Sequence, residues 1–138
     1  MILMDVPLQC INNAAITYHV PAKLIISILQ IERGQSGKII KNKNGTYDIG
    51  IMSVNSLWLP ELKKHGVFEQ DILFNSCNNI MIGTWILSKK IARRDDLLVG
   101  IGDYNSHYPP FNQKYSSKVK MRYDNMTLLL NEPTKMIL

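Results

Sequence analysis

The chain has 138 residues, a length typical of one domain. Its hydrophobic fraction of 46% and charged fraction of 20% indicate a packed core and exclude an intrinsically disordered chain. The net charge of +5 at pH 7 favours an anionic partner, such as a cell-wall polymer, a nucleic acid or a membrane surface, without choosing among them.

The N-terminal part of the chain predicts two consecutive helices. Residues 8–20 form the first, with Cys10, Ala14 and Tyr18 along one face. Residues 21–33 form the second, which opens at Pro21, because a proline has no N–H to leave unpaired there, and stops before Gly34. The second helix is apolar on most sides, so we expect it to be buried at the centre of the fold. Its apolar side chains are Leu24, Ile25, Ile26, Ile28, Leu29 and Ile31.

Glu32 is the only acidic residue of this buried helix and lies in its last predicted turn. Burial and the negative end of the helix dipole both disfavour a carboxylate. The pKa of Glu32 should therefore be raised, as a general acid working at neutral pH requires. The local pattern is equally compatible with a helix-terminal Glu that reaches solvent.

A polar loop follows, and its Asn44-Gly45 pair predicts a tight hairpin turn. Asp48 stands at the end of the loop, just before an apolar segment that returns to the core. The helix end and the hairpin would bring Glu32 and Asp48, 16 positions apart (48 minus 32), to opposite sides of a groove. Paired acidic side chains are the usual equipment for cleaving a glycosidic bond. Alternatively, Asp48 only braces the hairpin.

The rest of the sequence predicts helices around this region. Asn55 or Ser56 caps the first of them, and Pro109-Pro110 breaks the chain before the last. We expect a single domain over residues 1–138, with its core at about 8–130 and a loosely held tail at 131–138. The helices are predicted at residues 57–65, 74–94, 97–103 and 113–130.

Three blocks of the sequence stand out together. They are Glu32 at a helix end, NKNGTYDIGIMSVNSLW at residues 42–58, and GIGDYN at residues 100–105. Together they resemble the lysozyme-like lytic transglycosylases, in particular the branch associated with type III and type IV secretion, conjugation and pilus systems. The chain departs from the family pattern at three positions: Arg33 replaces a Ser, Ser53 a Gln and Asp103 an Ala.

The resemblance implies a mainly α, lysozyme-like (α+β) single domain, in which a small β-hairpin lies beside a central buried helix. It implies cleavage of the β-1,4 bond of peptidoglycan between N-acetylmuramic acid and N-acetylglucosamine, with a 1,6-anhydro product. Glu32 would be the catalytic acid and base, Tyr104 would hydrogen-bond near the reacting sugar, and Asp48 would assist or only brace the hairpin. Residues expected to bind the glycan are Met52, Ser53, Asn55, Asn105, Tyr108 and Tyr115.

The two cysteines, Cys10 and Cys77, are compatible with free buried thiols or with a disulfide. The resemblance favours the disulfide, and with it an oxidising compartment such as the periplasm. No secretory signal is visible at the start of the chain, so an exported protein would be represented here by its mature part. Two Cys and three scattered His lack the spacing of metal ligands, and the implied chemistry needs no cofactor.

The expected partners are peptidoglycan glycan strands and proteins of a secretion apparatus for which the enzyme locally opens the wall. We expect no nucleic-acid partner, since that role would rest on charge alone, and no membrane span, since no apolar run reaches ~18 residues. Two alternatives stay open. One is a lysozyme-type hydrolase, which would leave reducing ends. The other is a weakly active glycan-binding assembly protein, which the departures at Arg33 and Ser53 would suit.

Overall fold

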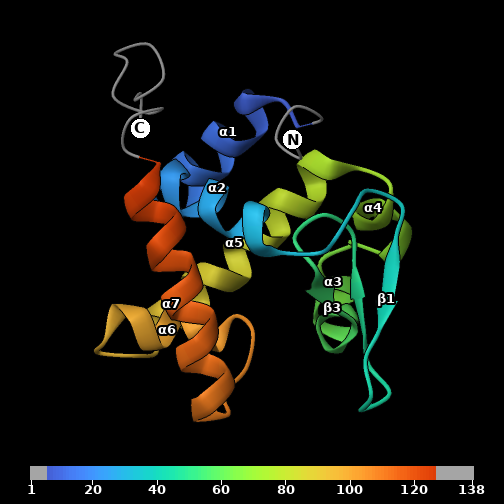
Figure 1. The fold of residues 1–138 in the computed structure, drawn as a ribbon. Helices are drawn as coiled ribbons and strands as arrows, with labels where there is room; N and C mark the ends of the chain where they lie inside the picture. The colour runs from blue at the N-terminus through green and yellow to red at the C-terminus, as the bar shows by residue number, and fades with distance from the viewer. Residues whose placement is uncertain (1–5, 127–138) are drawn as a thin grey trace.

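The computed structural model describes residues 6–126 and combines a helical part with a small sheet (Figure 1). The sheet, α3 and α4 lie on one side, α1, α2, α6 and α7 on the other, and α5 runs between them. The predicted mainly α, lysozyme-like (α+β) fold is confirmed. The helices are α1 (Leu8–Tyr18), α2 (Ala22–Ile31), a 3-10 helix (Ser56–Trp58), α3 (Leu59–Lys64), α4 (Glu69–Leu73), α5 (Ser76–Ala92), α6 (Leu97–Asp103) and α7 (Pro109–Asn125).

The central helix of the core is α2, as its sequence predicts. Its side chains Ile25, Ile28 and Leu29 are completely buried, and the helix packs against α1 and α7. Each such side chain contributes roughly 1.5–3 kcal/mol of transfer free energy. The ends of the helix differ from the prediction by one or two residues: Pro21 is the N-cap, and the helix ends at Ile31, with Glu32 as its C-cap.

The sheet is antiparallel, in the order β1 (Ile39–Lys41), β2 (Tyr47–Ile49), β3 (Val54–Asn55). Strands β1 and β2 form the predicted hairpin, in which Ile40 lies opposite Asp48. Its turn is closed by a hydrogen bond of 2.9 Å from the Asn42 amide to the Thr46 carbonyl, and Gly45 takes the positive φ of 89° that the turn requires. The third strand was not predicted, because two residues carry no periodic signal.

Several predicted helix bounds need correction. The helix expected at 57–65 opens as the 3-10 segment, capped by the Asn55 side chain. The helix expected at 74–94 begins only at Ser76, and α4 precedes it as a separate unpredicted helix. Pro109 and Pro110 begin α7 instead of breaking the chain before it, because proline is well suited to a first helical turn. The tail expected at 131–138 lies outside the described residues.

Two long-range features connect the helical part. A disulfide joins Cys10 on α1 to Cys77 in the first turn of α5, with 5.2 Å between the Cα atoms, so the predicted pairing is present. Helix α1 also packs along α5. Among the described residues, no helix combines the length and the apolar character needed to cross a membrane.

Candidate active site

A groove of about 340 Å³ opens between the end of α2, the β1–β2 hairpin and α7. It continues into a recess of about 70 Å³ that reaches Trp58 and Tyr104. The fold thus brings the two predicted carboxylates, Glu32 and Asp48, into one groove although they come from different elements. Four residues line both parts of the groove: Glu32, Asp48, Ser53 and Asn105.

Glu32 occupies the floor of the groove, surrounded mostly by protein. Its Oε2 atom accepts a hydrogen bond of 2.5 Å from the Tyr115 hydroxyl. Burial raises the pKa of Glu32 from 4.5 to about 7, against the lowering effect of hydrogen bonds from Tyr115 and Ser53, and the charge of Asp48 raises it further. The carboxyl group is therefore protonated in a large fraction of molecules near neutral pH, and the predicted rise in the pKa of Glu32 is present.

The backbone around Glu32 is fixed by a close approach at Gly34. A Cβ atom on Gly34 would lie only 2.0 Å from the carbonyl oxygen of Gly50. Gly34 was predicted as a helix stop, but the helix ends two residues earlier than predicted, and the glycine instead lets the chain after α2 pack against the turn that follows β2. This contact sets Glu32 beside that turn.

Asp48 faces the groove from the middle of β2, where it pairs with Ile40 on one side and Asn55 on the other. The Asn55 Nδ2 atom donates to Asp48 Oδ1 and to Thr46 Oγ1, both at 3.1 Å, while Asn55 Oδ1 accepts from the Leu57 amide at 2.9 Å. The polar atoms of Asn55 are therefore engaged within the protein. Asn55 was predicted to contact glycan. The arrangement favours a different role, in which Asn55 holds Asp48 in place.

The turn from Gly50 to Ser53 is held by Asn79, a completely enclosed amide on α5 that the sequence analysis missed. Asn79 Oδ1 accepts from the Met52 amide at 2.8 Å, and Nδ2 donates to the carbonyls of Ile49 and Ile72 at 2.9 and 3.0 Å. The only sequence signal for this role is a polar residue inside the apolar stripe of α5. Asn79 fixes the backbone that presents Ser53 to the groove.

The side chains of Met52 and Ser53 occupy different environments in this turn. The Met52 side chain is 0% exposed and packs against Gly83, so the predicted contact of Met52 with glycan is wrong: an apolar side chain at this position completes the core. Ser53 has a positive φ of 53° and lines the groove, where its side chain lowers the pKa of Glu32.

Tyr104, the C-cap of α6, is the predicted sugar contact beside Glu32. Its hydroxyl donates to the Met52 carbonyl at 2.8 Å, and burial raises the pKa of Tyr104 well above its usual value, so the donor stays protonated. The geometry therefore gives Tyr104 a bracing role between α6 and the Gly50–Ser53 turn. Its neighbour Asn105 is exposed and lines the groove, as predicted for a glycan contact.

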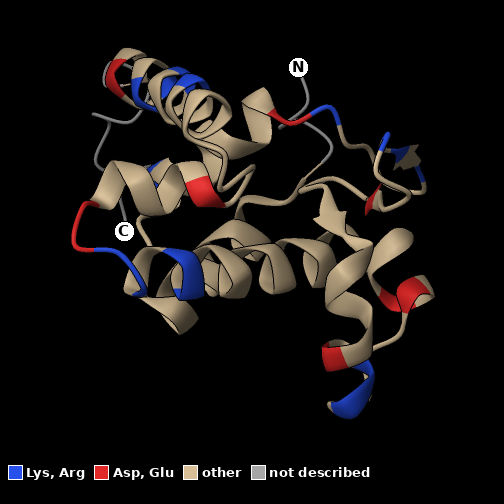
Figure 2. Cartoon of the chain, turned by 90° about the horizontal axis from the view of Figure 1, so that it is seen from below, with Lys and Arg blue, Asp and Glu red and all other residues tan. Residues whose placement is uncertain are grey.

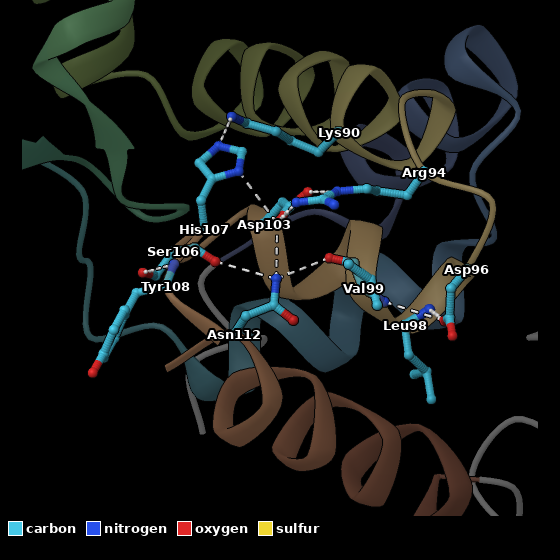
Figure 3. Close-up of polar contacts among 10 residues, drawn as sticks. All are labelled: Lys90, Arg94, Asp96, Leu98, Val99, Asp103, Ser106, His107, Tyr108 and Asn112. Carbon is cyan, nitrogen blue, oxygen red and sulfur yellow. Dashed lines mark hydrogen bonds and ion pairs between the residues drawn. The ribbon is translucent and has the colours of Figure 1, made fainter. Parts of the chain in front are cut away.

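The residue before Tyr104 is the buried carboxylate Asp103, at one of the three family departures. Arg94 donates to it from Nε at 2.7 Å and from Nη2 at 3.2 Å, and Asn112 Nδ2 donates at 2.8 Å. His107 Nδ1 lies 3.3 Å from the carboxylate, and Lys90 Nζ lies 2.9 Å from the other ring nitrogen of His107 (Figure 3). This network ties together α5, α6 and α7 behind the segment that carries Tyr104 and Asn105.

The two tyrosines predicted to stack on sugar rings behave differently. Tyr115 is 6% exposed, so its ring has no free face for a sugar, and its hydroxyl holds Glu32 instead. Burial and the charge of Glu32 raise the pKa of Tyr115 well above its usual value, which keeps this hydroxyl a donor. Tyr108 is exposed and packs edge-to-face on Phe111, with 5.1 Å between ring centroids; Phe111 lines the groove.

Within residues 6–126, no three His, Cys, Asp or Glu side chains gather closely enough to hold an ion.

The chain is similar in sequence to known proteins. The family model described as "Transglycosylase SLT domain" matches residues 9–126. The chain is 34% identical to a "Peptidoglycan-binding-like protein" of Escherichia coli O157:H7 over 88% of its own length and 80% of the relative. It is 28% identical to "Invasion protein IagB" of Salmonella typhimurium, over 83% of this chain and 75% of the relative. "Protein IpgF" of Shigella flexneri is 24% identical, over 83% and 79%.

Proposed function

Because the chain belongs to the transglycosylase SLT domain family, whose members are lytic transglycosylases, we propose that it cleaves peptidoglycan glycan strands. This membership confirms the resemblance predicted from the Glu32, Asn42–Trp58 and Gly100–Asn105 blocks. The bond attacked is the β-1,4 link between N-acetylmuramic acid and N-acetylglucosamine, and the product carries a 1,6-anhydro end. The observation that carries the proposal is the buried Glu32 carboxyl, which has a pKa of about 7 and is held by Tyr115 at the floor of the groove.

In the first step, Glu32 donates its proton to the glycosidic oxygen as the bond to the leaving sugar breaks. Tyr115 donates to Oε2, so the acidic proton is carried on Oε1. The muramic acid ring then develops the positive charge of an oxocarbenium ion. Glu32, now a carboxylate, accepts the proton of the sugar's own 6-hydroxyl, whose oxygen bonds to the anomeric carbon. Proton and electron pair are balanced without water or a cofactor.

The role proposed for Asp48 is electrostatic. Its charge lies close enough to raise the pKa of Glu32, and Asn55 holds its Oδ1 in place. A carboxylate on this side of the groove stabilises the positive charge of the oxocarbenium ion. The same pair of acids could serve a lysozyme-type hydrolase, in which water and not the 6-hydroxyl completes the reaction.

The deciding experiment is digestion of purified peptidoglycan by the wild type and by Glu32→Gln, followed by mass spectrometry. Anhydromuropeptides from the wild type alone are expected. Reducing ends would instead identify a hydrolase. If neither protein released fragments but both bound glycan, the weakly active assembly protein would be the better description.

We further propose that the protein acts in the periplasm, beside an apparatus that crosses the cell wall. The Cys10–Cys77 disulfide supports an oxidising compartment, and the similarity to an invasion protein supports the link to such an apparatus. Cell fractionation with thiol alkylation before lysis tests this: the expected form is oxidised and periplasmic. A reduced form confined to the cytoplasm would contradict the proposal.

A further inference from the structure

One face of α7 contributes a regular series of side chains to the groove. Phe111, Lys114, Tyr115 and Lys118 stand at positions i, i+3, i+4 and i+7, which share one face of a helix, and all four line the groove. Tyr115 is the residue that holds Glu32, so the two lysines stand on either side of that contact along the helix. Arg33, which follows Glu32 directly, lines the same groove.

These three cations line the groove, and three other basic residues of the protein form ion pairs instead. Lys89, Arg94 and Lys120 form ion pairs with Glu61, Asp103 and Asp124. In the described part of the chain, no carboxylate pairs with Arg33, Lys114 or Lys118. Lys and Arg recur along α7 (Figure 2). We call these three side chains, Arg33, Lys114 and Lys118, the basic rim.

The groove as a whole is left with positive charge. Among the described residues that line it, the only acidic ones are Asp48 and Glu32, and Glu32 is protonated in a large fraction of molecules near neutral pH. Lys114 and Lys118 are also four residues apart on one helix, a spacing at which like charges destabilise the helix slightly. The uncharged hydroxyl and acetamido groups of a glycan do not neutralise such a rim.

We propose that the basic rim is a subsite for the free carboxylates of the peptide stems carried by peptidoglycan. The stems branch from the muramic acid, the sugar whose bond Glu32 would cleave, so their carboxylates belong near the rim when that bond lies over Glu32. This inference rests on the proposed function and adds that the enzyme selects strands bearing charged stems.

The test measures binding in a Glu32→Gln background, so that strands are not cut. The probes are soluble uncrosslinked glycan strands with native stems, and the same strands with stem carboxyls converted to amides by carbodiimide and ammonia. The rim variant adds Lys114→Gln and Lys118→Gln. Its matched control adds Lys63→Gln and Lys64→Gln, two exposed lysines on α3 that do not line the groove.

The parent is expected to bind native strands about three- to tenfold more tightly than amidated strands at low salt, as two exposed ion pairs allow. The preference should shrink with rising salt, disappear in the rim variant and persist in the control. Equal binding of both strands by the parent, an unchanged preference in the rim variant, or no binding of native strands would overturn the proposal.

A kinetic measurement separates this subsite from the proposed chemistry. With Glu32 intact, the rim variant should show a raised KM on native strands, and its KM values for native and amidated strands should become equal. If the intact protein released no anhydro ends while the carboxylate preference remained, the proposed chemistry would fail and the subsite would stand. If the intact protein cleaved native and amidated strands with the same KM, the proposed chemistry would stand and the subsite would fail.

Discussion

The surroundings of the Glu32 carboxyl raise its pKa from 4.5 to about 7. Burial is the largest influence on its pKa, and two hydrogen bonds, from Tyr115 and Ser53, act against it. Ser53 stands where the family has a longer Gln, and it has a positive φ of 53° and lines the groove together with Glu32. Through Ser53, the departure from the family pattern affects the pKa of the acid itself.

The raised pKa of Glu32 predicts a pH-dependent stability difference. A rise from 4.5 to about 7 corresponds to roughly 3 kcal/mol. A carboxyl whose pKa is raised by folding contributes stability below its unfolded pKa, and this contribution is lost as the pH rises through the folded value. Glu32→Gln should therefore gain stability relative to the wild type between pH 4.5 and pH 8. Urea unfolding at both pH values measures this, and a constant difference would contradict it.

Tyr115→Phe should change the pH dependence of cleavage without removing the ring from the core. The hydroxyl donates to Glu32 and lowers its pKa, so its loss should raise that pKa and move the alkaline limb of the rate profile to higher pH. Turnover should fall as the carboxyl loses its fixed orientation, by about tenfold or more. Tyr123→Phe, on the same helix, is the control and should leave the profile unchanged.

At the scale of elements, the end of α6 is fixed from two directions. Tyr104 bonds to the Gly50–Ser53 turn in front, and Asp103 bonds to Arg94 on the α5–α6 connection and Asn112 on α7 behind. Burial alone would raise the pKa of Asp103, but the hydrogen bond from Arg94 and the charges around it lower the pKa overall. The charged carboxylate is therefore part of the packing between these helices.

Asp103→Ala, which restores the family residue, should destabilise this protein by about 2 kcal/mol, because Arg94 and Asn112 lose a buried acceptor. The contribution of a carboxylate with a lowered pKa is present above its unfolded pKa of 3.8 and is lost as the pH falls through the folded value. The difference in the free energy of unfolding between Asp103→Ala and the wild type should therefore become smaller at acidic pH. Denaturant unfolding at neutral and acidic pH measures both effects.

Asp95→Ala provides the control, since it removes the same charge from an exposed residue near α6. An equal loss of stability in both variants would show that charge alone, and not the network, is responsible. Activity gives a second measure, because loosening the segment that carries Asn105 should raise KM for glycan strands.

At the scale of the whole molecule, periodic and compositional signals in the sequence were sufficient to predict the main secondary-structure elements. The apolar run of α2 and the Asn44-Gly45 turn each follow from local sequence. The roles of Met52 and Tyr115 could not be predicted, because a motif does not say which atoms face inward. The roles of Asn79 and Asp103 could not be predicted either, because their hydrogen-bond partners are distant in sequence or on other elements. Only the packing of the fold brings these partners together.

The Cys10–Cys77 disulfide is the longest-range covalent constraint in the described chain. It spans 67 positions and joins α1 to the start of α5. Constraining an unfolded chain over such a loop is worth about 4 kcal/mol in the chain-entropy model. Cys10→Ser with Cys77→Ser should therefore lower the free energy of unfolding by a few kcal/mol, measured by denaturant unfolding.

The same variant tests how the disulfide relates to the site. Its two cysteines lie outside the groove lining, so glycan cleavage by the folded double variant should match the wild type at low temperature and fail at a lower temperature on heating. Treatment with a reductant should reproduce this in the wild type and leave the variant unchanged. Equal thermal inactivation of the wild type, the reduced wild type and the double variant would mean that the helical part is stable without the disulfide. The structural reason for an oxidising compartment would then be lost.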